Sequence, residues 1–217
     1  MWILYAFGSA FFAGLTAVLA KCGIEHTNSH LATALRTIVV LIFSWIMVGI
    51  VGSFSTIHTI THKTFLFLIL SGLSTGASWL CYFRALQLGN INKVTAVDKT
   101  SVVLTIILSL IFFKESITLY KIIGMIILTT GTYLMVEKKE DNKEISNAWL
   151  LYAVFSVVFA SLTTILGKIG ITNIESNLGT AIRTSVVLIM SWIVVFVTHS
   201  EMNMKRIKKK EKIFITL

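Results

Sequence analysis

Proline is absent from the 217 residues of this protein, and charged residues make up only 13% of them. Average usage would place about ten prolines in a chain of this length, so no helix is kinked by proline and any flexible point must rely on glycine. Soluble domains are roughly one quarter charged, whereas hydrophobic residues here make up 55%. This composition excludes a soluble or a disordered protein, and we expect the chain to reside in a lipid bilayer.

Motifs for catalysis and for metal binding are also missing. The two cysteines fit neither a disulfide framework nor a metal site. The pairs His26/His30 and His58/His62 flank one predicted helix at opposite ends, so they cannot converge on one ion. No nucleophile elbow, phosphate-binding glycine loop or zinc-type cluster is present. We therefore expect no enzymatic activity, no metal and no cofactor.

The net charge of +9 is concentrated beside the apolar runs and in the last segment, which holds six basic residues between Lys205 and Lys212. Basic loops next to membrane helices are topology determinants, so we expect no nucleic-acid partner. The side of the membrane opposite the amino terminus would be cytoplasmic. Without the last segment, the difference in basic residues between the two sides of the membrane is small. A five-helix unit that can insert into the membrane in either orientation would show such a small difference.

Seven apolar runs of about 20 residues recur along the chain, each long enough to cross a bilayer as a helix. The first lacks a preceding basic region and is followed by Lys21, so it is expected to be a retained span and not a cleaved signal peptide. The predicted fold class is all-α, a polytopic membrane helical bundle of a plasma or bacterial inner membrane. The predicted spans are 2–20, 31–51, 65–83, 94–113, 117–136, 149–167 and 178–198.

The chain contains an internal duplication at an offset of about 147 residues. WILYAFGSAFFAGLTAVLAKCGI (2–24) aligns with WLLYAVFSVVFASLTTILGKIGI (149–171), and LATALRTIVVLIFSWI (31–46) aligns with LGTAIRTSVVLIMSWI (178–193). Because a unit of five spans is odd, a second unit in tandem begins on the opposite side of the membrane, which makes the copies inverted repeats. We predict three segments: a complete five-helix unit at 1–137, a polar linker at 138–147, and an incomplete second unit at 148–217 with two helices, a basic loop and the stub of a third.

Ionisable side chains inside predicted spans are the first candidates for a site, because a charge in lipid costs at least a few kcal/mol. Arg36 and Asp98 both lie about one turn inside a span. Paired with Arg36 or Arg84, Asp98 would be held so as to bind a cationic substrate or a proton. The alternative is that the arginines snorkel to the interface while Asp98 caps its helix.

Polar residues add a second group of candidates. Asp98, Ser101 and Thr105 share one face of the predicted fourth helix, and Trp79 and Tyr82 lie near the end of the third. Together they predict a substrate cavity with aromatic walls. The competing interpretation is that the small hydroxyl residues only pack helices closely.

The segment WLCYFRALQLGNINKVTAVDKTSVVLTIILSLIFFKESITLYKIIGMIILTTG (79–131) resembles the EamA-type domain of the drug/metabolite transporter superfamily. The chain departs from the family pattern at Ala96, where proline is common at the start of the fourth helix, and at Lys114, where glycine usually precedes the glutamate. The shared features are an Ala85-Leu86 pair before Gly89, an extended entry to the fourth helix, Glu115 in the loop between helices four and five, and Gly124 and Gly131.

This resemblance implies a secondary transporter of small metabolites or drugs that works by alternating access, without ATP hydrolysis. Glu115 is a candidate gate residue, or only a charge favoured at a helix N-terminus. Because the second unit lacks counterparts of Trp79, Asp98 and Glu115, a working carrier would need a second chain, so a homo-oligomer is expected, with an antiparallel pair as one arrangement. The alternative is a non-transporting membrane subunit or a truncated remnant of a ten-helix carrier.

Overall fold

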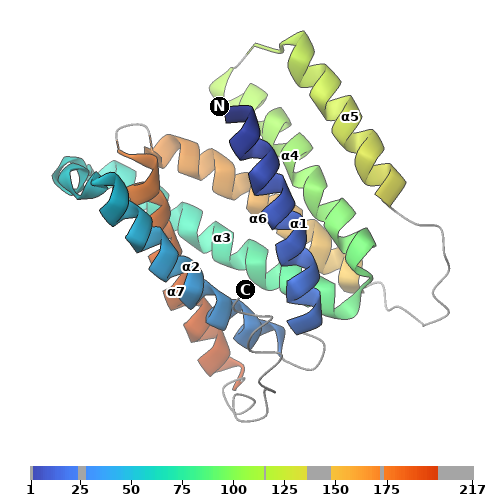
Figure 1. Ribbon diagram of the computed structural model, residues 1–217, viewed down its shortest axis with the longest axis horizontal. Helices are drawn as coiled ribbons and strands as arrows, with labels where there is room; N and C mark the ends of the chain where they lie inside the picture. The colour runs from blue at the N-terminus through green and yellow to red at the C-terminus, as the bar shows by residue number, and fades with distance from the viewer. Residues whose placement is uncertain (1, 24–27, 115, 136–147, 172–173, 200–217) are drawn as a thin grey trace.

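The computed structural model describes residues 2–23, 28–114, 116–135, 148–171 and 174–199 (Figure 1). In these residues the chain is all-helical, as predicted. Six helices are long and apolar enough to cross a membrane, while α5 has 17 residues and is shorter than such a span. The elements are α1 (Trp2–Gly23), α2 (Ser29–Val51), the 3₁₀-helix η1 (Ser53–Thr59), α3 (His62–Leu88), α4 (Ile91–Phe113), α5 (Leu119–Met135), α6 (Ala148–Gly170) and α7 (Ser176–Val197).

Local signals set the ends of several helices. The side chains of Asn28, Asn90 and Glu175 accept hydrogen bonds from backbone N–H groups at the starts of α2, α4 and α7, which satisfies donors that have no partner within the helix. α2 ends at Gly52, whose φ of 75° is left-handed and therefore favours glycine. Since α4 begins after Asn90, Asp98 lies two turns inside the helix, and the suggestion that Asp98 caps α4 is wrong.

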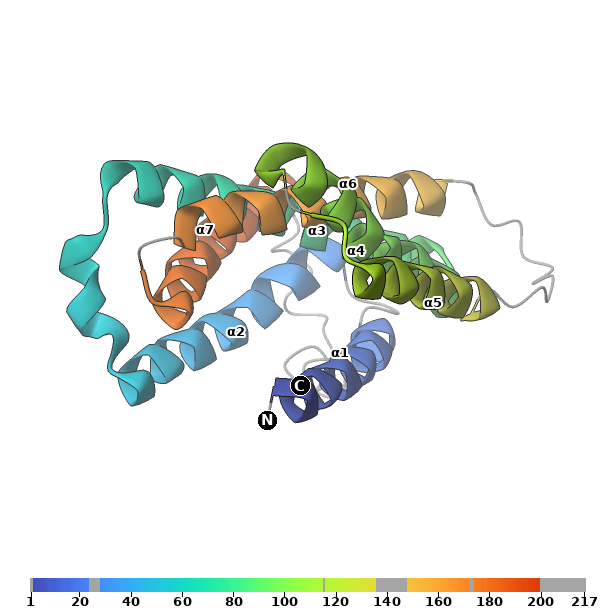
Figure 2. The same cartoon turned by 90° about the horizontal axis from the view of Figure 1, so that it is seen from above.

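The two helices of the second copy pack into the first copy. α6 lies against both α3 and α4, and α7 lies beside α2 and α3 (Figures 1 and 2). Small residues permit this close approach: a Cβ added to Gly72 of α3 would lie 2.8 Å from the Cβ of Val186 and 2.9 Å from the carbonyl oxygen of Arg183 on α7. Contacts between the two copies therefore hold α2, α3 and α4 in place against α6 and α7.

A polar contact outside the spans also joins the copies. The hydroxyl of Ser53 in η1 donates to Oε2 of Glu175, the residue that caps α7, at 2.6 Å. This hydrogen bond, followed by those from the N–H groups of Leu178 and Asn177, lowers the pKa of the Glu175 carboxyl below its ordinary value. Glu175 is therefore ionised near neutral pH, which is the form that accepts all of these hydrogen bonds.

α1 lies to one side of the other helices (Figure 2) and has few tertiary contacts. Its last turns pack through buried Ala17 and Ala20. The rest of its small-residue face is uncovered: Ser9 and Gly14 are exposed. Their equivalents in the second copy, Ser156 and Ser161 on α6, are fully buried against α3 and α4. The same helix face, present in both copies, is therefore buried on α6 and exposed on α1.

The close packing of α3 on α7 generates a stability prediction. Gly72→Ala forces Val186 or the α7 backbone to shift, so we expect it to lower the free energy of unfolding by about 1–3 kcal/mol. Gly124→Ala on α5 is the matched control, because nothing lies within 4 Å of a Cβ at Gly124, and alanine there is expected to be neutral or mildly stabilising. Unfolding by SDS titration in mixed micelles measures both, and equal stability of the two variants would contradict the described α3–α7 interface.

Candidate functional site

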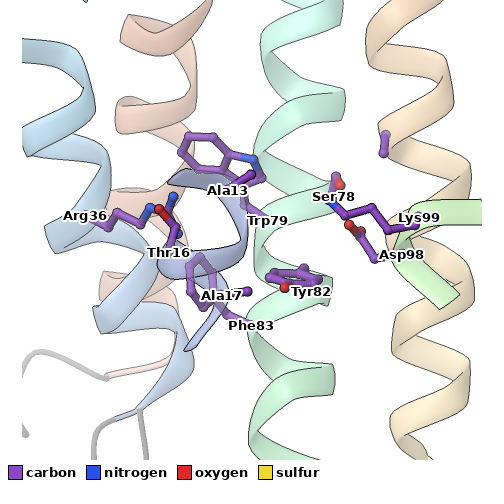
Figure 3. Close-up of a pocket in the computed structure, with 11 residues that line it drawn as sticks. Ala13, Thr16, Ala17, Arg36, Ser78, Trp79, Tyr82, Phe83, Asp98 and Lys99 are labelled. Carbon is purple, nitrogen blue, oxygen red and sulfur yellow. The ribbon is translucent and has the colours of Figure 1, made fainter. Parts of the chain in front are cut away.

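Four of the predicted site residues line one cavity of about 300 Å³: Arg36, Trp79, Tyr82 and Asp98. Figure 3 shows Arg36 on one side of this cavity and Asp98 on the other, with Trp79 and Tyr82 of α3 between them. Helices far apart in sequence contribute to it: α3, α4 and α6 line one side, and α1 and α2 line the other. The further lining residues are Ala13, Thr16, Ala17, Ser78, Phe83, Lys99 and Ala160.

Among the described residues, Arg36 contacts two aromatic rings and no carboxylate. Its guanidinium carbon lies 5.7 Å from the ring centroid of Trp79 and 5.5 Å from that of Phe83, which are cation–π distances. In the described part of the chain neither expected ion pair to Asp98 forms: Nη1 of Arg84 instead donates to Oε1 of Gln87 at 2.5 Å. The two rings hold the Arg36 side chain at the cavity, and its N–H donors have no acidic partner among the described residues.

Asp98 is held by a hydroxyl of the second copy. Its Oδ1 accepts a hydrogen bond from Oγ of Ser156 on α6 at 3.2 Å. The Ser156 hydroxyl lies 3.3 Å from that of Ser78 on α3, and Ser78 also donates to the Ser156 carbonyl oxygen at 3.1 Å. Both serines are buried. A chain of polar contacts therefore runs through α3, α6 and α4 and ends at the carboxylate.

Ser101 and Thr105 are described by the structure and do not line this cavity. The carbonyl oxygen of Ser101 accepts a hydrogen bond from Oγ of Ser161 at 3.0 Å, in the interface between α4 and α6, and Thr105 lies one turn further along the same helix. Helix packing accounts for the Ser101 contact. Glu115 lies outside the described residues.

Sequence reasoning missed Thr16, Phe83 and Ser156. Ser156 belongs to the second copy, and its contact with Asp98 depends on how α6 packs against α4, which no local pattern reveals. Phe83 lies four residues after Trp79 on the same helix face, so the spacing of the aromatic residues was the available signal for its inclusion.

A second cavity, of about 550 Å³, lies between α1, α2 and α7, and it shares Thr16 and Arg36 with the first. Asn177 and Thr180 at the start of α7 contribute polar groups, while Phe43 and Met47 of α2 make it largely apolar. Arg36 therefore borders two compartments, and both copies contribute to each of them.

The sequence profile of the EamA-like transporter family matches residues 1–137. The chain belongs to this family. With its six candidate spans, it is a multi-pass integral membrane protein and a membrane transporter in general terms.

Two relatives show how far the similarity to known proteins extends. An uncharacterized transporter in the cobO 3′ region of Sinorhizobium sp is 42% identical over 134 residues, which cover 62% of this chain and 95% of that protein. An uncharacterized protein of Methanocaldococcus jannaschii is 27% identical over 103 residues, covering 43% of this chain and 75% of the relative. No solved structure matches the chain.

The contact between Asp98 and Ser156 can be tested by a double-mutant cycle. For Asp98→Ala and Ser156→Ala we expect an interaction free energy of about 1–2 kcal/mol, because each single change removes the same charge-assisted hydrogen bond. Ser161→Ala is the control, since Ser161 is equally buried on α6 but donates to backbone carbonyls of Ser101 and Val157. Its effect should add to that of Asp98→Ala within about 0.5 kcal/mol. Unfolding of the three single and two double variants in micelles gives these values, and additivity in both cycles would exclude the contact.

Proposed function

We propose that the protein is a secondary transporter, or permease, of small metabolites or drugs that works by alternating access in a plasma or bacterial inner membrane. The observation that carries the proposal is the cavity within the helical bundle, where Arg36 and Asp98 face a space walled by Trp79 and Tyr82. Charged groups inside spans are costly, and they usually mark a pathway for a solute or ion. Family membership supports transport but leaves the solute open.

The arrangement of the two copies supports the alternating-access part of the proposal. Inverted repeats that meet around a central site rock against each other and open it to either side in turn. Here α2 and α7, which occupy equivalent positions in the two copies, pack side by side, and Arg36 of α2 lies at the border of both cavities. A relative motion of the copies would change the access to Arg36 from each cavity.

The proposed domain arrangement is a complete EamA-type unit at 1–137, a linker at 138–147 and an incomplete second unit at 148–217. The packing of α6 and α7 onto α2, α3 and α4 supports a second copy that is part of the same bundle. The linker and the basic segment after α7 lie outside the described residues.

We further propose that the transporting unit is a homo-oligomer in which α1 packs against a second copy of the chain. The small residues Ala6, Ala10 and Gly14 recur every fourth position on α1 and are exposed, a spacing that lets membrane helices approach closely. Within each chain, α6 already covers the surface formed by α3 and α4. We therefore propose that α1 of one chain pairs with α1 of the other chain, which buries this face.

Transport is tested with the full chain in liposomes. A panel of labelled neutral, anionic and cationic solutes should include at least one that enters only with protein present. Asp98→Asn should reduce its uptake at least tenfold, because the cavity loses the carboxylate that would bind a proton or a cation during transport. Asp141→Asn, which removes the same charge from the predicted linker, is the matched control and should keep wild-type uptake. Normal uptake by Asp98→Asn would remove Asp98 from the site, and a panel without any protein-dependent uptake would favour the non-transporting alternative.

Association is tested with two differently tagged copies expressed together. Gly14→Leu should abolish their co-purification, because a large side chain blocks the close approach of two α1 helices. Gly124→Leu on α5 is the control: neither Gly14 nor Gly124 has any atom within 4 Å of an added Cβ, so neither change should disturb the single chain. Co-purification that survives Gly14→Leu, or that fails equally in both variants, argues against pairing through α1.

A further inference from the structure

The charged groups inside the bundle are not balanced. Asp98 is the one acidic residue in the seven helices that the structure describes, from α1 to α7. The second helix of each copy carries an arginine at the equivalent position, Arg36 on α2 and Arg183 on α7, and both are at least half-buried. The helices that line the cavity therefore carry more positive than negative charge.

Asp98 does not neutralise Arg36. Its Oδ1 is hydrogen-bonded to Ser156, it lies across the cavity from Arg36 in Figure 3, and no ion pair within 4 Å joins the two among the described residues. Lys99, the next residue, lines the cavity on the Asp98 side and offsets the negative charge there. The local field at Arg36 is thus left positive.

The geometry of Arg36 suits it to hold an anion. A guanidinium has five N–H donors in a planar fork that matches a carboxylate, sulfonate or phosphate. The rings of Trp79 and Phe83 contact this group and support its position at the cavity. In the low-dielectric interior of a helical bundle each hydrogen bond to an anion is strengthened. The aromatic walls would contact an apolar body attached to the anionic group.

We propose that Arg36 binds the anionic group of the solute, so that the transporter takes small organic anions with a body of about one ring. This inference rests on the proposed transport function and adds the substrate class. A body of about one ring fits the cavity of about 300 Å³ that Trp79 and Tyr82 wall, which lies at the lower end of the range for pockets that bind organic ligands.

Two probes of the same ring and opposite permanent charge test the proposal: benzenesulfonate and phenyltrimethylammonium. Neither changes its charge with pH, so any difference in affinity reports the sign of the charge at the site. With the full chain in lipid nanodiscs, isothermal titration calorimetry should show benzenesulfonate bound at least tenfold more tightly than phenyltrimethylammonium.

Variants locate the preference. Arg36→Gln should weaken benzenesulfonate binding at least tenfold, and Arg36→Lys should fall between Gln and wild type, because it keeps the charge but not the planar fork. Arg84→Gln is the matched control: it removes an arginine that bonds to Gln87 and does not line the cavity, so affinity should stay at the wild-type value. A thermal unfolding scan of each variant confirms that binding is compared between folded proteins.

Other outcomes overturn the anion site. Tighter binding of phenyltrimethylammonium, equal affinity for the two probes, no binding of either, or a benzenesulfonate affinity that Arg36→Gln leaves unchanged would each do so. The proposed transport function fails only if the liposome panel of neutral, anionic and cationic solutes shows no protein-dependent uptake. A carrier that moves a neutral or cationic solute would therefore leave transport standing while the inference about Arg36 falls.

Discussion

The packing of α6 against α3 and α4 is the contact on which the rest of the structure depends. A membrane interior offers helices no hydrophobic gain for associating, so close approach and interhelical hydrogen bonds must hold them together. α6 supplies both through buried serines, of which Ser156 contacts Ser78 and Asp98, and Ser161 contacts the backbone of Ser101. The contact that holds the bundle together therefore also orients the carboxylate of the site.

The site is asymmetric although the sequence is duplicated. Arg36 and Arg183 are equivalent residues in the two copies, yet only Arg36 meets the aromatic residues Trp79 and Phe83. Those rings belong to α3, which has no counterpart among the described residues of the second copy. Arg183 instead lies where its backbone closely approaches Gly72. The same residue type thus borders a cavity in one copy and packs between helices in the other.

The sequence predicted the helices well and part of the lining of the first cavity. Runs of about 20 apolar residues indicate spans because the bilayer imposes that length, and the duplication, which shifts Trp2 onto Trp149, made two further helices evident. The cavity residues Arg36 and Asp98 stood out because charges in spans are rare. The contacts of these two residues could not be predicted. The rings that contact Arg36 and the hydroxyl that binds Asp98 depend on which helices pack together, and hydropathy carries no information about that.

The uncovered face of α1 follows from the same duplication. α1 and α6 have closely similar sequences, and evolution of a helix face rich in small residues is expected where another helix approaches, not where lipid does. On α6 this face is buried by the first copy, as at Ser156. On α1 the equivalent Ser9 is exposed, since none of the described helices covers it. The first cavity is bordered by Ala13 and Thr16 of this same helix, so a second chain packed on α1, as proposed, would also change how open the cavity is.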